Sequence, residues 1–215
     1  MMRYAMRAGA LLAIALVLLP PLGPDAELLF AAHMTQHLLL IGAAAPLLAA
    51  SGAFDAMIVR GPGRLLVQPA QAWASFVGVF LFWHWPGAFR WAAQAEWSRI
   101  LELVTILAGA CLLWTTALSP RNPASMSEGA RALFVMTAAI VTDLPGVIML
   151  FAPHAICTMP GEDAAAFGLS PIEDQQIAGL LMWVPANLVF FSIATWLFAR
   201  WMSEPDHAGS SRAAP

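Results

Sequence analysis

The sequence predicts an all-α fold, a polytopic membrane bundle of about six transmembrane helices. Three observations lead to this prediction. Apolar residues make up 60% of the 215 residues and charged residues only 11%, and the mean hydropathy is +0.72. Apolar runs recur along the chain at lengths near the ~20 residues that cross a hydrocarbon core. The basic residues, all of them arginine, gather in alternate connecting segments. Soluble domains rarely combine these features.

The predicted spans alternate with short loops that contain turn residues, such as "PPLGPDAE" and "SPRNPASMSEG". The first apolar run follows Arg3 and Arg7 and is short, as in a signal peptide, but no small-x-small cleavage site follows it, so a retained anchor is favoured. The third run stops at Pro86, and the last contains no charged residue. In chain order, the predicted spans are Ala8–Leu22, Leu28–Ala50, Ala70–Trp85, Ile100–Leu118, Ala130–Ala152 and Ile177–Ala199.

The arginine positions predict that both termini are cytoplasmic. With six spans and an inner N-terminus, the outer segments contain only Arg90 and Arg99. An excess of positive charge on the inner side is typical of membrane proteins. Residues 1–203 are expected to form a single integral membrane domain, because no loop is long enough for a second one, and residues 204–215 a disordered cytoplasmic tail. The inner segments contain Arg3, Arg7, Arg60, Arg64, Arg121, Arg131, Arg200 and Arg212.

This orientation, derived from the arginines alone, places four of the five histidines at the outer membrane face. His33 and His37 begin the second span in "HMTQHLLLIG", His84 ends the third in "FLFWHWPGAF", and His154 follows the fifth in "FAPHAICTMP". Polar groups at membrane depth are costly and are usually functional, so a shared polar site is expected there. At the same depth the sixth span opens with Asp174, Gln175 and Gln176.

The spacing of His33 and His37 favours metal binding. Side chains four apart on a helix share one face, and two neutral imidazoles placed in this way chelate copper, zinc or iron. Each feature also has a structural explanation, because interfacial histidines cap helices, methionines fill cores, and His84 beside Trp83 and Trp85 fits an aromatic belt. Soft ligands that Cu(I) would add are available in Met34, Met149, Met159, Met182 and Cys157.

Two acids lie inside predicted spans. Asp143 lies near the middle of the fifth span, before Pro145, and is either a site for a proton, ion or metal or a partner for backbone freed by the proline. Glu102 lies one turn into the fourth span, near the membrane surface, where a structural role is favoured. Cys111 and Cys157 differ in depth, so no disulfide is expected between them. No phosphate loop, nucleophile elbow or HExxH motif indicates an enzyme, and no basic face indicates nucleic-acid binding.

The motifs "HMTQHLLL", "PLLAASG", "FWHWPGAF" and "GLSPIEDQQIAGLLMWVP" occur in an order and spacing that resemble one family. It is the polytopic CtaG family of cytochrome c oxidase assembly factors, associated with caa-type oxidases, and "DQQIAGLLMW" is its most specific element here. Many relatives have a histidine after a glutamate early in the fourth span, where this chain has Leu103 after Glu102. The family's motif positions fall on His33, Gln36, His37, Trp83, His84, Asp174, Gln175, Gln176, Gly179, Met182 and Trp183.

The resemblance implies a non-enzymatic, multi-pass protein of the bacterial inner (plasma) membrane that supports assembly of haem-copper oxidase. Its expected partners are oxidase subunits, a periplasmic copper donor and the lipid bilayer. Three alternatives stay open: a metal-free assembly scaffold, a haem-binding membrane oxidoreductase that uses His37 and His84, and a copper transporter that uses Asp143.

For an assembly factor of this family, the sequence predicts a copper site, for Cu(I), at the outer (periplasmic) face. Residues of the same motifs are expected to orient the ligands, as partners of ligating imidazoles usually do. Asp174 is a candidate for either role. The predicted ligands are His33 and His37, assisted by His84 and by one of Met182, Asp174 or Met159. The orienting or motif residues are Gln36, Gln175, Gln176 and Trp183.

Overall fold

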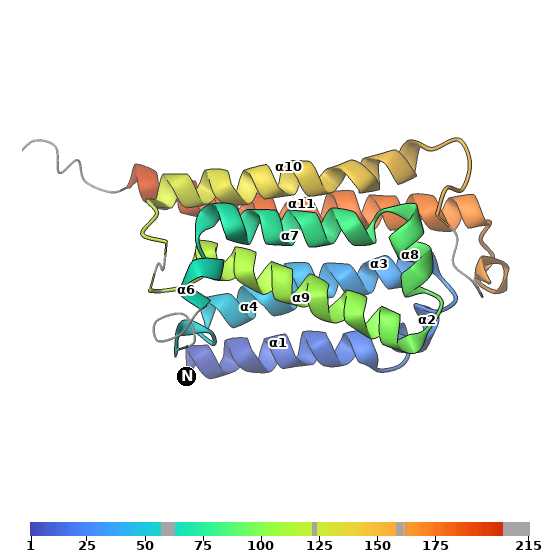
Figure 1. Ribbon diagram of the computed structural model, residues 1–215, viewed down its shortest axis with the longest axis horizontal. Helices are drawn as coiled ribbons and strands as arrows, with labels where there is room; N and C mark the ends of the chain where they lie inside the picture. Colours follow the sequence, from blue (N-terminus) through green and yellow to red (C-terminus); the bar gives the residue numbers. More distant parts are fainter. Residues whose placement is uncertain (57–62, 122–123, 158–160, 162, 204–215) are drawn as a thin grey trace, which may run out of the picture.

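The computed structural model describes residues 1–56, 63–121, 124–157, 161 and 163–203. Within these residues the chain is helical and contains no strand, and the long helices run side by side along one axis (Figure 1). The elements are α1 (Met2–Leu18), α2 (Leu22–Asp25), α3 (Phe30–Leu39), the π-helix η1 (Leu40–Ala44), α4 (Ala45–Ala50), α6 (Gly63–Leu66), α7 (Pro69–Trp83), α8 (Pro86–Ala92), α9 (Glu96–Leu118), α10 (Glu128–Phe151), the 3₁₀ turn η2 (Ala164–Phe167) and α11 (Pro171–Met202).

Each of the six predicted spans corresponds to a helical segment. Among the described residues, four segments are long and apolar enough to cross a membrane, namely Phe30–Ala50, Glu96–Leu118, Glu128–Phe151 and Pro171–Met202. Helices α1, of 17 residues, and α7, of 15 residues, are shorter than the ~20 residues of a full crossing. The all-helical membrane fold is therefore confirmed. Six crossings and the orientation stay predictions, although α1 begins and α11 ends at the same end of the bundle, as an even number of crossings requires (Figure 1).

The second span is one continuous helix with a π turn in its middle. Pro46 lies just after this turn, in α4, and has no N–H to donate to a preceding carbonyl. In a π turn the carbonyl of Ile41 would accept a hydrogen bond from the nitrogen of residue 46. Because that residue is proline, the carbonyl needs another donor. The buried indole N–H of Trp114 supplies one at 2.8 Å. This bond fixes α9 against the second span.

The core lies between α3, α7, α9, α10 and α11. Its largest fully buried side chains include Trp114, Phe30 and Phe76, and the ring of Trp114 packs at 4.8 Å from that of Phe190. The outward faces of α10 and α11 are also apolar, with exposed Leu144 and Leu188 among them. Apolar residues on both sides of a helix are typical of a membrane bundle, where lipid replaces water outside.

Helices α10 and α11 pack tightly against each other at two glycines. A Cβ atom built on Gly179 would lie 2.6 Å from the carbonyl oxygen of Gly146 and 2.9 Å from the amide nitrogen of Leu150. Small residues at such crossings allow backbones to pack closely in membranes. The contact matters for the site because α11 supplies Asp174, five residues before Gly179, and Met182, three residues after it.

We expect Gly179→Ala to destabilise the protein by about 1–3 kcal/mol, because the added methyl group meets rigid backbone. The measurement is thermal unfolding of the purified protein in detergent. Gly78→Ala is the matched control, since Gly78 lies within α7 and a Cβ there has no heavy atom within 4 Å. Equal unfolding temperatures for the two variants would show that the α10–α11 crossing is not tight.

Candidate metal centre

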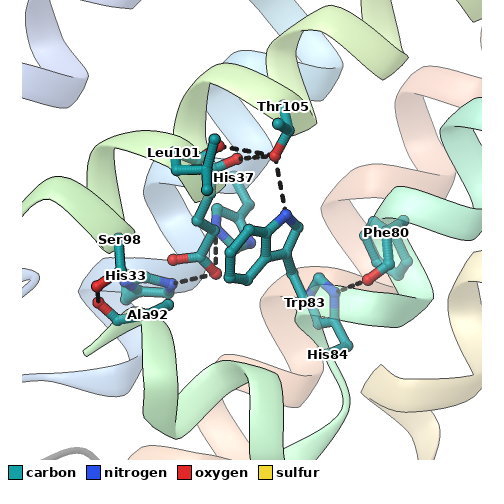
Figure 2. A network of polar contacts seen from close by, with 10 residues as sticks. His33, His37, Phe80, Trp83, His84, Ala92, Ser98, Leu101 and Thr105 are labelled. Atoms are coloured by element: carbon teal, nitrogen blue, oxygen red, sulfur yellow. Dashed lines mark hydrogen bonds and ion pairs between the residues drawn. The ribbon is translucent and has the colours of Figure 1, made fainter. Parts of the chain in front are cut away.

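Three polar side chains from two helices converge near the end of the bundle at which α3 begins. His33 and His37 lie one turn apart on α3, and Glu102 lies on α9. One carboxylate oxygen, Oε1 of Glu102, is 3.3 Å from Nε2 of His33 and 3.4 Å from Nε2 of His37. Figure 2 shows both contacts ending on the same carboxylate. The potential ligand atoms of these residues all lie within 4.8 Å of one another, a spacing that fits one shared metal ion.

The three side chains are almost completely buried, and much of their polar capacity is unused. Their exposed fractions are 3% for His33, 2% for His37 and 0% for Glu102. Nδ1 of each histidine and Oε2 of Glu102 have no hydrogen-bond partner among the described residues. The contact between His37 and Glu102 has the distance of an ion pair but not the direction of a hydrogen bond, so Nε2 of His37 is also unsatisfied. Such groups are costly in an apolar interior unless something binds them.

Glu102 is the residue that sequence analysis did not count among the ligands. Its place is set by α8, which folds back onto the start of α9. The hydroxyl of Ser98 lies within hydrogen-bond distance of the carbonyl oxygens of Ala95 (2.7 Å) and Ala92 (3.0 Å) and so holds this corner. Figure 2 shows the contact with Ala92. The chain therefore covers the first turns of α9 and encloses Glu102. The available signal was an acid inside a predicted span, which is a candidate functional residue by default.

His84 borders the group from a third helix. It is the C-cap residue of α7, because Pro86 forces Trp85 into extended backbone. Nδ1 of His84 donates to the carbonyl of Phe80 at 2.7 Å (Figure 2), which leaves the lone pair of a neutral ring on Nε2. That atom has no partner among the described residues, the side chain is 8% exposed, and its ring lies 5.5 Å from that of His37.

Asp174 holds the beginning of α3 in place. Its two carboxylate oxygens accept hydrogen bonds from the backbone N–H groups of Phe30 (2.8 Å) and Ala31 (2.9 Å). These donors are unpaired within the helix, and a carboxylate at a helix N-terminus also complements the macrodipole. His33 follows within the first turn. Asp174 lies outside the group of three and has both oxygens occupied, so its structural contacts are those of a positioning residue.

Two of the predicted orienting residues also bond to backbone. The amide of Gln36 donates to the carbonyl of Val17 at 2.7 Å, which joins α3 to α1. Gln175 is fully buried; its oxygen accepts from Ile156 (2.6 Å) and Cys157 (3.0 Å) and its nitrogen donates to Met149 (3.0 Å). These bonds fix the chain where α10 ends.

The other two orienting candidates lie elsewhere on α11. Gln176 is half-buried, and Trp183 packs on Phe151 at a ring distance of 6.3 Å along the open outer face of α11. The motif tryptophan Trp83, by contrast, lies near the group and donates to Thr105 at 2.8 Å (Figure 2).

The remaining candidates are dispersed. His154 is exposed after α10, and Met159 lies outside the described residues. Cys157 is buried and, like Cys111, is free, and burial raises the pKa of the Cys157 thiol, which disfavours the thiolate that metals bind. Asp143 is half-buried on α10 and accepts a hydrogen bond from Asn187 at 2.8 Å.

Two cavities adjoin the histidines. The outer one, of about 410 Å³, is lined by His33 together with Glu27, Glu96 and Arg99, and the Arg99 guanidinium pairs with the Glu27 carboxylate. The deeper one, of about 30 Å³, is lined by His37 and His84 and by two methionines, Met34 and Met182. The predicted ligand Met182 is therefore close to the histidines, on the side away from the outer cavity.

The sequence matches the family model described as cytochrome c oxidase caa3 assembly factor (Caa3_CtaG) over residues 2–204. The chain belongs to this family. The family assignment made from the motifs is thus confirmed, and the matched range includes every residue of the centre described above. Comparisons with curated proteins and with solved structures gave no match. Membership in Caa3_CtaG identifies a membrane protein of cytochrome c oxidase assembly, a role that does not itself require catalysis.

Replacing Asp174 tests its role in positioning α3. We expect Asp174→Ala to destabilise the protein by about 2 kcal/mol or more, because a buried N–H group, that of Phe30, and a partly buried one, that of Ala31, lose a charged acceptor. Hydrogen exchange followed by mass spectrometry should show faster exchange in the segment that contains Phe30 and Ala31. Asp163→Ala is the control, since Asp163 caps the short turn η2 from an exposed position. Unchanged exchange in α3 would contradict the positioning role.

Proposed function

We propose that the protein binds copper at the outer (periplasmic) face of a bacterial inner membrane and supports metal-centre assembly in a haem-copper oxidase. The observation that carries this proposal is the buried group of His33, His37 and Glu102, whose nitrogen and oxygen atoms face one another and retain unused lone pairs. Copper is the cargo of the protein. The family assignment indicates cytochrome c oxidase as the partner that would receive the copper.

The donor atoms suit a transition-metal ion. Imidazole nitrogens bind copper, zinc, nickel and iron, whereas sites for magnesium or calcium are built from oxygen alone. The charge of the site decides which of these transition-metal ions fits best. Glu102 is the acid of the group and is fully buried, so a monovalent ion bound to it and to two neutral imidazoles forms a neutral complex. A divalent ion would leave a net positive charge in an apolar interior, which is costly. Charge balance thus favours Cu(I).

The outer cavity offers a route between this site and the exterior. His33 lines it together with Glu27, Glu96 and Arg99. Arg99 pairs with Glu27, so the carboxylate of Glu96 leaves one net negative charge, which attracts cations. A site with three protein ligands that opens on a cavity of about 410 Å³ is suited to exchange copper with a periplasmic donor and with an oxidase subunit. The deeper cavity of about 30 Å³ is far smaller than the ~300 Å³ or more of an ordinary cofactor pocket, which argues against haem between His37 and His84.

Copper binding is tested by a Cu(I) competition titration on the protein purified in detergent. We expect stoichiometric binding by the native chain, and a loss of at least about 100-fold in affinity for His33→Ala/His37→Ala, more than outer-shell changes typically cause. Glu102→Gln keeps the shape of the side chain but removes its charge, so it should also weaken binding. His154→Ala is the matched control, because His154 is exposed. Equal affinities for all four proteins would contradict the metal site.

The role in assembly is tested in cells that depend on the protein for oxidase maturation. We expect cells with His33→Ala/His37→Ala, present in the membrane at the native level, to have low oxidase activity. Added copper should restore part of this activity, because a weakened site is filled more fully at a higher copper concentration. The measurements are oxidase activity and the copper content of the purified oxidase. Full activity without copper addition would favour the metal-free scaffold instead.

A further inference from the structure

We propose a second metal site deeper in the bundle, at which His84 and the thioethers of Met34 and Met182 bind a soft monovalent ion. The inference deepens the proposed function and rests on it, because the ion reaches this site through the group of His33, His37 and Glu102. The deeper site discriminates Cu(I) from divalent ions after the outer group has accepted an ion.

The site is the cavity of about 30 Å³ between α3, α7, α10 and α11. One water needs about 10–15 Å³ on this measure, so the cavity has room for a metal ion. Met34, His37, His84 and Met182 line it. Thr142 lines it as well, but its hydroxyl already donates to the carbonyl of Ala138 at 2.9 Å. The remaining lining residues are apolar.

His84 provides the observation that points to a ligand. Its Nε2 atom is buried and has no hydrogen-bond partner among the described residues, which costs free energy in an apolar cavity. Its Nδ1 atom donates to the Phe80 carbonyl at 2.7 Å. A histidine that binds a metal usually donates its other ring N–H to a backbone carbonyl or a carboxylate, which fixes the tautomer and the ring direction. His84 is held in that state, and the ring of Phe80 stacks on it at 4.0 Å.

The two methionines determine which ion the site selects. Met34 is 1% exposed and Met182 is 8% exposed, on helices that Asp174 joins through its bonds to Phe30 and Ala31. Thioethers are soft ligands that select Cu(I) over harder divalent ions. No carboxylate lines this cavity among the described residues, so a monovalent ion there carries one uncompensated charge and a divalent ion carries two. Ligand softness and the lower cost of a single buried charge therefore both favour Cu(I) over a divalent ion.

His37 connects the two sites. Its Nε2 atom faces Glu102 at 3.4 Å, and its ring also lines the deeper cavity and lies 5.5 Å from the ring of His84. A neutral imidazole has one lone pair, so His37 binds an ion on one side at a time. The order of the donors from the outer cavity inward is thus nitrogen and carboxylate first, then nitrogen and thioether. An ion passes from the harder set to the softer one.

The test uses Ag(I), a redox-inert soft monovalent ion, and Zn(II) as separate probes, with binding measured by competition titration on the full-length protein in detergent. We expect the native protein to bind both ions. Met34→Leu/Met182→Leu, which keeps side-chain volume nearly constant, should weaken Ag(I) binding by at least about 10-fold and leave Zn(II) binding unchanged. Glu102→Gln should weaken Zn(II) binding more than Ag(I) binding.

Met149→Leu is the matched control, because Met149 is equally buried and does not line the cavity. X-ray absorption of the Cu(I)-loaded protein adds a direct readout: a sulfur shell should be present in the native and Met149→Leu proteins and lost in Met34→Leu/Met182→Leu. Thermal unfolding verifies that each variant is folded.

The outcomes separate the two proposals. If the native protein binds neither probe nor Cu(I), the proposed copper function fails and the deeper site fails with it. If the native protein binds Zn(II) and Cu(I) but the double methionine variant keeps full Ag(I) affinity and its sulfur shell, the deeper site is overturned while the outer site stands. Loss of Ag(I) affinity in the Met149→Leu control would also overturn it, because the effect would then be one of general packing.

Discussion

The half of this protein that contains the candidate metal centre depends on one constraint, the cost of burying polar groups where no water can satisfy them. The chain meets that cost by pairing buried side chains with free backbone. Asp174 accepts hydrogen bonds from the N–H groups at the start of α3, and Gln175 accepts from those that follow α10. The indole of Trp114 donates to the Ile41 carbonyl, which has no donor within the π turn. The bonds of Asp174 and Trp114 join elements far apart in sequence, and those of Gln175 join α11 to the segment that precedes it. These buried polar residues therefore help to hold the helices together.

The same constraint separates structural polar residues from candidate ligands. Asp174 and Gln175 have their buried atoms satisfied, whereas His33, His37 and Glu102 keep several that are not. A folded chain does not ordinarily leave so many unsatisfied atoms together. Their convergence from α3 and α9, with His84 beside them from α7, is what distinguishes a binding site from a set of helix caps.

Electrostatics and ligand chemistry act together at this site. A single buried carboxylate balances a single positive charge, and the imidazoles around it add donors without adding charge. On the deeper side of His37 the donors become thioethers and the carboxylate is absent. The bundle therefore offers a graded environment along one line of side chains, from the charged residues of the outer cavity to an apolar interior. This gradient is the basis of the copper-binding role proposed above for the chain, a member of an oxidase assembly family.

Hydropathy and residue spacing by themselves determined the helical membrane class, the positions of the helices and the layer in which the polar residues lie. These are local properties, since an apolar run of sufficient length forms a helix and a polar residue at its end marks a depth. Only the tertiary structure decided which faces meet. In the folded chain Glu102 is buried, Asp174 accepts a hydrogen bond from the start of α3, and Trp183 packs on Phe151 away from the histidines. The reason is physical: helices that are apolar on all sides carry little amphipathic signal, so their rotation about their own axes is set by packing at contacts such as Gly146 with Gly179, which no single helix contains.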